Sequence, residues 1–135
     1  MNIIGISAFY HESTCCLLQD GQLVAAAPEE RFTRVKHDRR SPINAFRYCL
    51  EAGGHLSPAD IDCLAYYERP DKKLARQRAM GLGAGGDPGR PERDLRDTLG
   101  YEGPLLTFDH HLSHGASSFF FSGFREAAVM TVDGV

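Results

Sequence analysis

The sequence predicts an α/β domain built on a mixed sheet, and two observations carry that prediction. The first is a series of three short apolar segments near the start, residues 2–9, 13–19 and 22–27. The second is a change after residue 40, where segments with helical periodicity alternate with short apolar runs. Strands joined by tight turns pair antiparallel and strands joined through helices pair parallel, so one sheet should contain both kinds of pairing.

The first three strands are expected to form a continuous antiparallel unit. Asp20 and Gly21 separate the second strand from the third and are a strong signal for a two-residue hairpin turn. The turn after the first strand reads "FYHEST" and contains His11. Ligands in α/β proteins often bind where strands end, so His11 is a candidate binding residue. A structural role for this single histidine remains open beside that interpretation.

A charged stretch separates the hairpin strands from the first predicted helix. Ser41 and Pro42 suit the N-cap and the first position of a helix, and residues 53–54, Gly-Gly, suit its end. Between them apolar residues recur at helical spacing. A second, shorter helix is expected to open at residues 57–58, Ser-Pro.

The remaining elements alternate between strand and helix. Residues 63–67 and 104–108 are predicted strands, residues 112–121 a helix, and residues 127–132 a sixth strand. Between the first two of these strands, residues 68–103 are polar and rich in Gly, Pro and Arg. We expect this segment to form a helix fragment and an irregular connection.

Composition places the chain among ordinary globular domains. It has 135 residues, of which 42% are hydrophobic and 24% charged, with a net charge of −3. The mixed charges give no basic surface for nucleic acid, and no apolar run approaches the roughly 20 residues that span a membrane. The start lacks a secretory leader, and the four cysteines lack metal-site spacing, so we expect reduced thiols and a cytoplasmic location.

The carboxyl end departs from a typical domain. The chain reaches residue 135 directly after residues 127–132, its most apolar stretch, and no closing helix follows. A strand of this kind needs cover at the sheet edge. We therefore expect residues 1–135 to be one domain that is incomplete at its carboxyl end.

For two further patterns, the spacing favours a loop over a binding site. Residues 81–86 contain a formal GxGxxG, but no strand precedes it and no helix follows, so a loop is expected. Residues 29–40 hold eight charged side chains and His37. Such a run is usually a solvated loop, although Arg31 and Lys36 could bind an anionic substrate.

The strongest candidate site is the cluster in "TFDHHLSHG". His110 and His114 are four residues apart, so a helix presents them on one face, at the spacing used by pairs of metal ligands. His111 could also converge with His114. Asp133 could add a carboxylate, and Gly134 would let a ligand approach the backbone. Spacing alone leaves two alternatives open, a metal or phosphate site and a packed polar helix start.

Two long stretches resemble one known family. They are "GISAFYHESTCCLLQDGQLVAAAPEERFTRVKHD" and "DHHLSHGASSFFFSGFREAAVMTVDGV". In this order they are similar to the amino-terminal part of the O-carbamoyltransferases of the nodulation and tobramycin type. The resemblance covers both ends of the chain, whereas residues 71–103 match poorly.

This resemblance implies a fold and a reaction. The fold would be that of actin, sugar kinases and Hsp70, with ribonuclease-H-like halves that close over a nucleotide. The family's carboxy-terminal domain makes carbamoyl-adenylate from carbamoyl phosphate and ATP. The amino-terminal domain then transfers the carbamoyl group to a hydroxyl of a small-molecule or sugar acceptor, whose identity the sequence leaves open.

The resemblance also implies roles for individual residues. His110 and His114 would reproduce an HxxxH motif that binds a divalent metal, usually iron, and Asp133 would be a further ligand. His11 would lie at the transfer site as general base, with Lys36 near the substrate or phosphates. Asp133 and Gly134 would also contact the ATP-derived cofactor.

Two rival functions remain. One is a tRNA-modifying threonylcarbamoyladenosine enzyme of the same fold, which the absence of a basic patch disfavours. The other is an inactive metal-binding or interaction fragment. Assays with tRNA, with small hydroxylated acceptors, and with ATP and carbamoyl phosphate would separate these alternatives.

Overall fold

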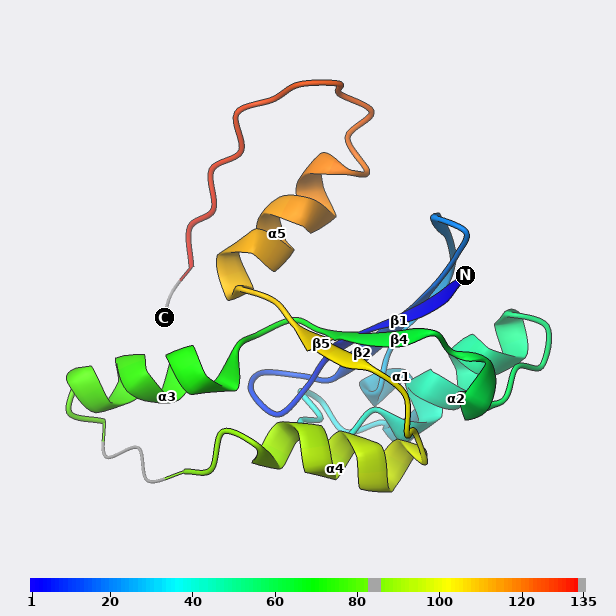
Figure 1. Ribbon diagram of the computed structural model, residues 1–135, viewed down its shortest axis with the longest axis horizontal. Coiled ribbons are helices and arrows are strands. Elements are labelled where there is room, and N and C mark those ends of the chain that lie inside the picture. The colour runs from blue at the N-terminus through cyan, green and yellow to red at the C-terminus, as the bar shows by residue number, and fades with distance from the viewer. Residues whose placement is uncertain (83–85, 134–135) are drawn as a thin grey trace.

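A five-stranded mixed sheet in the order β3-β2-β1-β4-β5 lies at the centre of the molecule (Figure 1). The computed structural model describes residues 1–82 and 86–133. Its strands are β1 Asn2–Ser7, β2 Thr14–Gln19, β3 Gln22–Pro28, β4 Cys63–Tyr66 and β5 Leu105–Thr107. β1 pairs antiparallel with β2 and parallel with β4, which confirms the predicted mixed sheet.

The hairpin between β2 and β3 forms as predicted. Asp20 and Gly21 have φ values of 50° and 81°, the left-handed pair that a type I′ turn requires. Within the sheet, Gly5 lies opposite Cys16, and a Cβ at Gly5 would approach the Cys16 sulfur to 2.7 Å. A larger residue at position 5 would therefore require the Cys16 side chain or the strand itself to shift.

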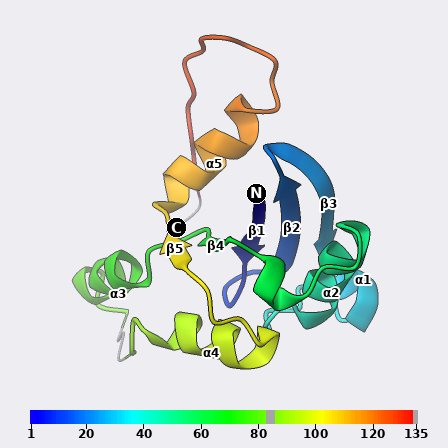
Figure 2. The same ribbon diagram turned by 45° about the vertical axis from the view of Figure 1, so that its right-hand side comes forward.

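Helices cover the two faces of the sheet unequally (Figures 1 and 2). α2 and α4 lie below the sheet in Figure 1, and α5 stands above it. The helical elements are α1 Glu30–Thr33, α2 Ile43–Ala52, the 3-10 turn Pro58–Asp60, α3 Pro70–Ala79, α4 Arg90–Leu99 and α5 His110–Phe119. Among the described residues, no helix is both long and apolar enough to cross a membrane.

The core lies between the sheet and the α2–α4 layer. It consists of inward-facing strand residues and the apolar faces of the two helices, including Ile4, Ile6, Cys15, Leu17, Leu64, Tyr66, Phe46, Cys49, Leu95 and Leu99. Burying one such Leu or Ile contributes about 1.5–3 kcal/mol, so this layer supplies most of the stability. All four cysteines are free, and Cys15 and Cys49 are buried.

The segment of residues 68–103 is more helical than the sequence analysis predicted. It contains two helices, α3 and α4, where one helix fragment was expected. Pro91 lies in the first turn of α4, and Gly100 follows its end with φ 63°. Leu95 and Leu99 point into the core one turn apart. Pro at the start and Gly after the end are helix signals, which the low hydrophobicity of the segment obscured.

Three other predictions need correction or lie outside the described residues. The charged stretch 29–40 contains the one-turn helix α1 and is not a loop throughout. Residues 127–132 form no strand in the described part of the chain; they run back along α5 (Figure 1). β-prone side chains make a strand only where another strand offers a partner, and Met130 is 86% exposed. Of the GxGxxG at 81–86, residues 83–85 lie outside the described residues.

The amino end of α2 is capped by a residue distant in sequence. Ser41, the predicted N-cap, is bonded to Thr98 through their hydroxyl oxygens at 2.5 Å. The Glu29 carboxylate instead accepts hydrogen bonds from the Ala45 backbone N–H at 2.8 Å and from the Asn44 side chain at 2.6 Å. Glu29 is 3% exposed. A buried carboxylate thus satisfies helix donors that would otherwise lack partners.

We expect Glu29→Ala to lower the free energy of unfolding by about 2 kcal/mol, because it leaves buried N–H groups without an acceptor. Urea unfolding followed by circular dichroism measures this. The exposed Glu51 of the same helix provides the control, and Glu51→Ala should change stability by less than about 0.5 kcal/mol. Equal effects of the two substitutions would show that Glu29 does not stabilise α2.

Candidate metal centre

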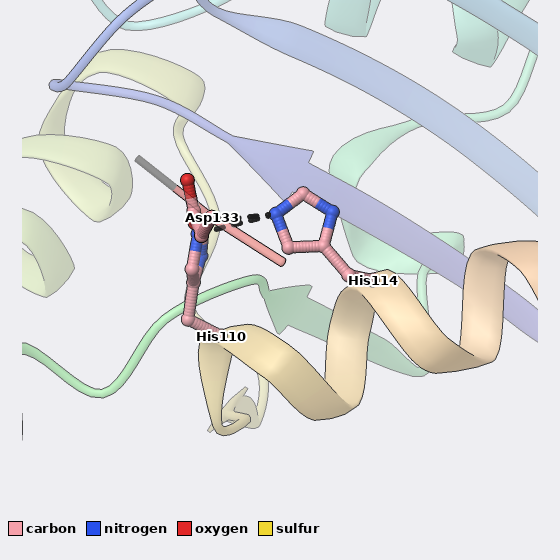
Figure 3. Close-up of side chains that lie close together, drawn as sticks. All are labelled: His110, His114 and Asp133. Atoms are coloured by element: carbon pink, nitrogen blue, oxygen red, sulfur yellow. Dashed lines mark hydrogen bonds and ion pairs between the residues drawn. The ribbon is translucent and has the colours of Figure 1, made fainter. Parts of the chain in front are cut away.

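α5 presents two histidines to one carboxylate (Figure 3). The Nε2 atoms of His110 and His114 are 3.2 Å apart, since residues four apart share a helix face. Asp133 Oδ2 lies 2.5 Å from His110 Nε2 and 3.6 Å from His114 Nε2. The three residues that the sequence analysis proposed as ligands are therefore brought together by the fold. Their donor atoms all lie within 4.8 Å of one another.

The position of Asp133 depends on the segment that follows α5. After Gly123, whose φ is 76°, the chain reverses and runs back along the helix (Figure 1). A Cβ at Gly115 would lie 3.8 Å from Val129 and 4.0 Å from Thr131, so the segment passes close to the helix at this glycine. Gly115 therefore leaves room for the returning chain.

His110 is the most enclosed member of the cluster. Its side chain is 16% exposed, whereas that of His114 is 55% exposed. The Tyr67 ring meets His110 edge-on, with centroids 5.3 Å apart. The Ser113 hydroxyl donates to the Tyr67 carbonyl at 3.0 Å and ties α5 to the end of β4. Burial, followed by the charge of Glu68, raises the pKa of Tyr67 well above its usual range, so its hydroxyl stays protonated.

The donor set fits a divalent transition metal. Two imidazole nitrogens and one carboxylate oxygen are the ligands that zinc and non-haem iron sites use, with positions left for substrate. His110 Nδ1 is buried and has no hydrogen-bond partner among the described residues. The Nε2 atom of His110 is the one that faces Asp133 and His114. The residues present fit the metal that the resemblance implies.

His11 shares a cavity with the cluster. This cavity, of about 220 Å³, is lined by Ser7, Tyr10, His11, Glu12, Tyr67 and the three cluster residues. The rings of Tyr10 and His11 are in contact, with centroids 4.3 Å apart. The end of β1 and the beginning of α5, separated by about a hundred residues of chain, thus form one site.

A second loop holds the segment that carries His11. Asp38 and Arg39 accept backbone hydrogen bonds, from Ser13 at 2.7 Å and from Phe9 at 3.1 Å. The Arg40 guanidinium binds the Asp38 carboxylate through two nitrogens, at 2.9 and 2.6 Å. Arg40 beside Asp38 holds the pKa of that carboxyl well below its usual range. Residues 38–40 thus fix both ends of the loop around His11.

The other predicted site residues lie elsewhere. Lys36 is exposed in the loop after α1 and lines neither of the two cavities that reach the cluster. Arg31 and His111 are exposed. Gly134 lies outside the described residues. Glu12, Glu30 and His37 form a second acidic group, but Glu12 and His37 are 50% and 59% exposed.

Sequence reasoning missed the charged residues of α3. Glu68, Lys73 and Arg76 line a further cavity beside His110 and Asp133. Their segment was interpreted as an irregular connection. The available signal was helical spacing, because Lys73 and Arg76 are three residues apart and a helix presents them on one face.

Comparisons with solved structures and with other sequences identify the fold and the family of the chain. YeaZ from Pseudomonas aeruginosa aligns with 90% of this chain and 50% of its own, with a TM-score of 0.50 and 14% identity. The fold is the mixed-sheet, ribonuclease-H-like half of the actin, sugar-kinase and Hsp70 class, as predicted. Residues 2–84 match the family described as the carbamoyltransferase N-terminus. The chain belongs to that carbamoyltransferase family.

Two relatives show how much of a longer protein the chain represents. It is 38% identical to the uncharacterized protein sll1178 of Synechocystis, over 99% of this chain and 25% of that protein. It is 34% identical to the nodulation protein NolNO of Sinorhizobium fredii, over 95% of this chain and 20% of NolNO. The chain therefore spans a fifth to a quarter of these relatives.

We expect His110→Ala or His114→Ala to remove most of the bound metal from the full-length protein. Loss of an outer partner of a ligand already weakens metal binding about 10–100-fold, so loss of a ligand should cost more. Asp133→Asn should weaken binding while preserving shape. The matched control is His111→Ala, because His111 points about 100° away from His110 around the helix, and this variant should retain metal. Elemental analysis measures the bound metal, and melting temperatures show whether each variant is folded. Equal metal content in all four variants would show that the metal binds elsewhere.

We expect Asp38→Ala to lower the free energy of unfolding at pH 7 by about 2 kcal/mol, because an ion pair and its hydrogen bonds are lost. The folded-state pKa of Asp38 lies below its ordinary value. Its stabilisation is therefore complete above about pH 4 and is lost as pH falls further. Urea unfolding should show the gap to wild type narrowing between about pH 4 and pH 2. A gap independent of pH, or one matched by exposed Asp97→Ala, would contradict this.

Proposed function

We propose that this chain forms the metal- and substrate-binding part of an O-carbamoyltransferase. The reaction would move a carbamoyl group from carbamoyl-adenylate, made from carbamoyl phosphate and ATP, to a hydroxyl of a small-molecule or sugar acceptor. Family membership supports carbamoyl transfer. The observation that carries the proposal is the single cavity shared by His11 and the cluster of His110, His114 and Asp133. His11, the proposed proton acceptor, lines that cavity together with three donor atoms suited to a metal.

The cluster would hold the metal that activates the carbamoyl group. A divalent metal, iron in this proposal, bound by His110, His114 and Asp133 would supply Lewis acidity that polarises the carbamoyl carbonyl. Asp133 offsets positive charge at the cluster and orients His110 through the 2.5 Å contact. Tyr67 packs against His110 and limits the water that reaches it.

His11 would act as the general base. It would accept the proton of the acceptor hydroxyl as the oxygen bonds to the carbamoyl carbon. The bond between that carbon and the adenylate phosphate oxygen would break, and AMP would leave with the electron pair. The contact with Tyr10 supports this role, as do the hydrogen bonds that the N–H groups of Phe9 and Ser13 donate to loop residues 38–40, because they limit where His11 can lie.

The remaining predicted contacts belong to the same proposal. Lys36 would bind the substrate or its phosphates from the charged loop after α1, where it is exposed. Asp133 and Gly134 would contact the nucleotide-derived part. The net charge of −3 disfavours tRNA as acceptor, since nucleic-acid sites carry basic surfaces.

We expect His11→Ala in the full-length protein to reduce the turnover of carbamoyl transfer about 10²–10⁴-fold, the usual contribution of a general base. Metal content should stay unchanged, because His11 is not in the donor cluster. Product formation from ATP, carbamoyl phosphate and a panel of hydroxylated acceptors, followed by mass spectrometry, measures this.

The exposed His55 provides the control, and His55→Asn should retain full turnover. Lys36→Ala should raise the Michaelis constant of a substrate. The general-base role is wrong if His11→Ala retains wild-type turnover. Carbamoyl transfer itself is wrong if the wild-type protein carbamoylates none of the acceptors.

A further inference from the structure

A second cavity adjoins the metal cluster on the side of α3. It measures about 450 Å³, a size found among small-molecule sites. His110 and Asp133 line it together with Tyr10, Lys73 and Arg76. Because His110, Asp133 and Tyr10 also line the His11 cavity, the cluster lies between two cavities. Figure 1 shows α3 on the side of the molecule where α5 begins.

Two cations of this cavity are held by one buried carboxylate. Lys73 Nζ lies 3.1 Å from Glu68 Oε2, and an Arg76 guanidinium nitrogen lies 3.3 Å from Glu68 Oε1. The Glu68 side chain is 7% exposed, whereas Lys73 is 21% and Arg76 41% exposed. Glu68 also lines the cavity, so this wall has two cations and one carboxylate and keeps a single net positive charge.

Lys73 is restrained from a second direction. Its amine also lies 3.8 Å from the centre of the Tyr10 ring, a cation–π contact. An ammonium held by both Glu68 and Tyr10 loses little rotamer freedom when a ligand binds. Arg76 adds a guanidinium, whose planar donors suit phosphate oxygens. Preorganised cations of this kind favour anion binding.

We propose that the cavity beside α3 is a phosphate-binding subsite in which Lys73 and Arg76 bind the phosphate group of a substrate. That this ligand is a substrate rests on the proposed transferase function. Asp133, on the opposite wall, is an unfavourable charge for a phosphate, but it already contacts His110 at 2.5 Å. The phosphate binds on the α3 wall, and the His11 cavity is left for the acceptor hydroxyl.

The apolar part of the same cavity indicates what the phosphate is attached to. Met80 and Leu82 line it and are 61% and 67% exposed. An exposed apolar surface next to two cations suits a ligand that joins a phosphate to a flat apolar group, as a nucleoside monophosphate does. A small phosphate compound would contact the cations alone. The two kinds of ligand therefore differ in whether Met80 and Leu82 contribute to binding.

Methyl NMR of Met80 tests the subsite without any turnover. The full-length protein is labelled at methionine methyl groups, and the Met80 signal is assigned by its loss in Met80→Leu. It is then titrated with inorganic phosphate, AMP and adenosine. Phosphate and AMP should shift the signal saturably, and adenosine should not at the same concentrations. Tenfold tighter binding of AMP identifies a nucleotide phosphate, and equal binding identifies a small phosphate compound.

Single charge removals test the two cations. Lys73→Met and Arg76→Met should each weaken phosphate binding about tenfold, as the loss of one charge-assisted hydrogen bond does. Each variant leaves one cation on Glu68, so neither strands the buried carboxylate. The matched control is Lys72→Met, because the neighbouring Lys72 binds Asp109 at 2.7 Å and lines neither cavity. Melting temperatures confirm that the variants are folded.

The outcomes separate this proposal from the proposed function. Phosphate shifts that survive in His110→Ala support the subsite even if the metal or the transferase activity fails. The proposal is overturned if phosphate leaves Met80 unmoved, if adenosine binds as well as AMP, or if Lys72→Met weakens binding as much as the other two variants.

Discussion

The parallel pairing of β1 with β4 is the constraint on which the site depends. It aligns Ile6 with Tyr66, so the two strands end at the same edge of the sheet. The loop with His11 continues from β1, and Tyr67 follows β4 directly. α5 then contacts this edge through the Ser113 hydroxyl on the Tyr67 carbonyl. Residues from three distant segments meet because two neighbouring strands point the same way, the usual arrangement of ligand sites in open α/β sheets.

Buried carboxylates connect this edge to the rest of the fold. Glu29 caps α2, Asp38 organises the loop that holds the His11 segment, and Glu68 gathers two cations of α3. All three residues are buried. A buried carboxylate is costly unless it is hydrogen-bonded or paired, and each of these three has partners. They fix the start of α2, the loop that holds the His11 segment, and one side of α3.

The two cavities divide the surroundings of the cluster by charge. His11 and Glu12 face one cavity, and the cations of α3 face the other. A transfer reaction that needs both a hydroxyl acceptor and an anionic donor has a physical reason for such a division. An uncharged hydroxyl is activated by a base, whereas a phosphate is bound by cations. The cluster of His110, His114 and Asp133 lies between the two cavities.

The sequence by itself determined the features that depend on near neighbours. Asp20 and Gly21 specify the hairpin, the periodic apolar residues specify α2, and the four-residue spacing brings His110 and His114 together. These follow from local backbone geometry, which a short stretch of sequence contains. The mixed sheet was predicted for the same reason, because it follows from the order of the elements along the chain.

Only the tertiary structure decided the contacts between distant segments. Glu29 rather than Ser41 caps α2, because the turn after β3 brings its carboxylate to the helix. Residues 127–132 have the composition of a strand but find no strand partner in the described part of the chain. The cavity beside α3 combines Lys73 and Arg76 with His110 and Asp133, which lie far away in the sequence. Such pairings depend on distances across the fold, which local propensity does not contain.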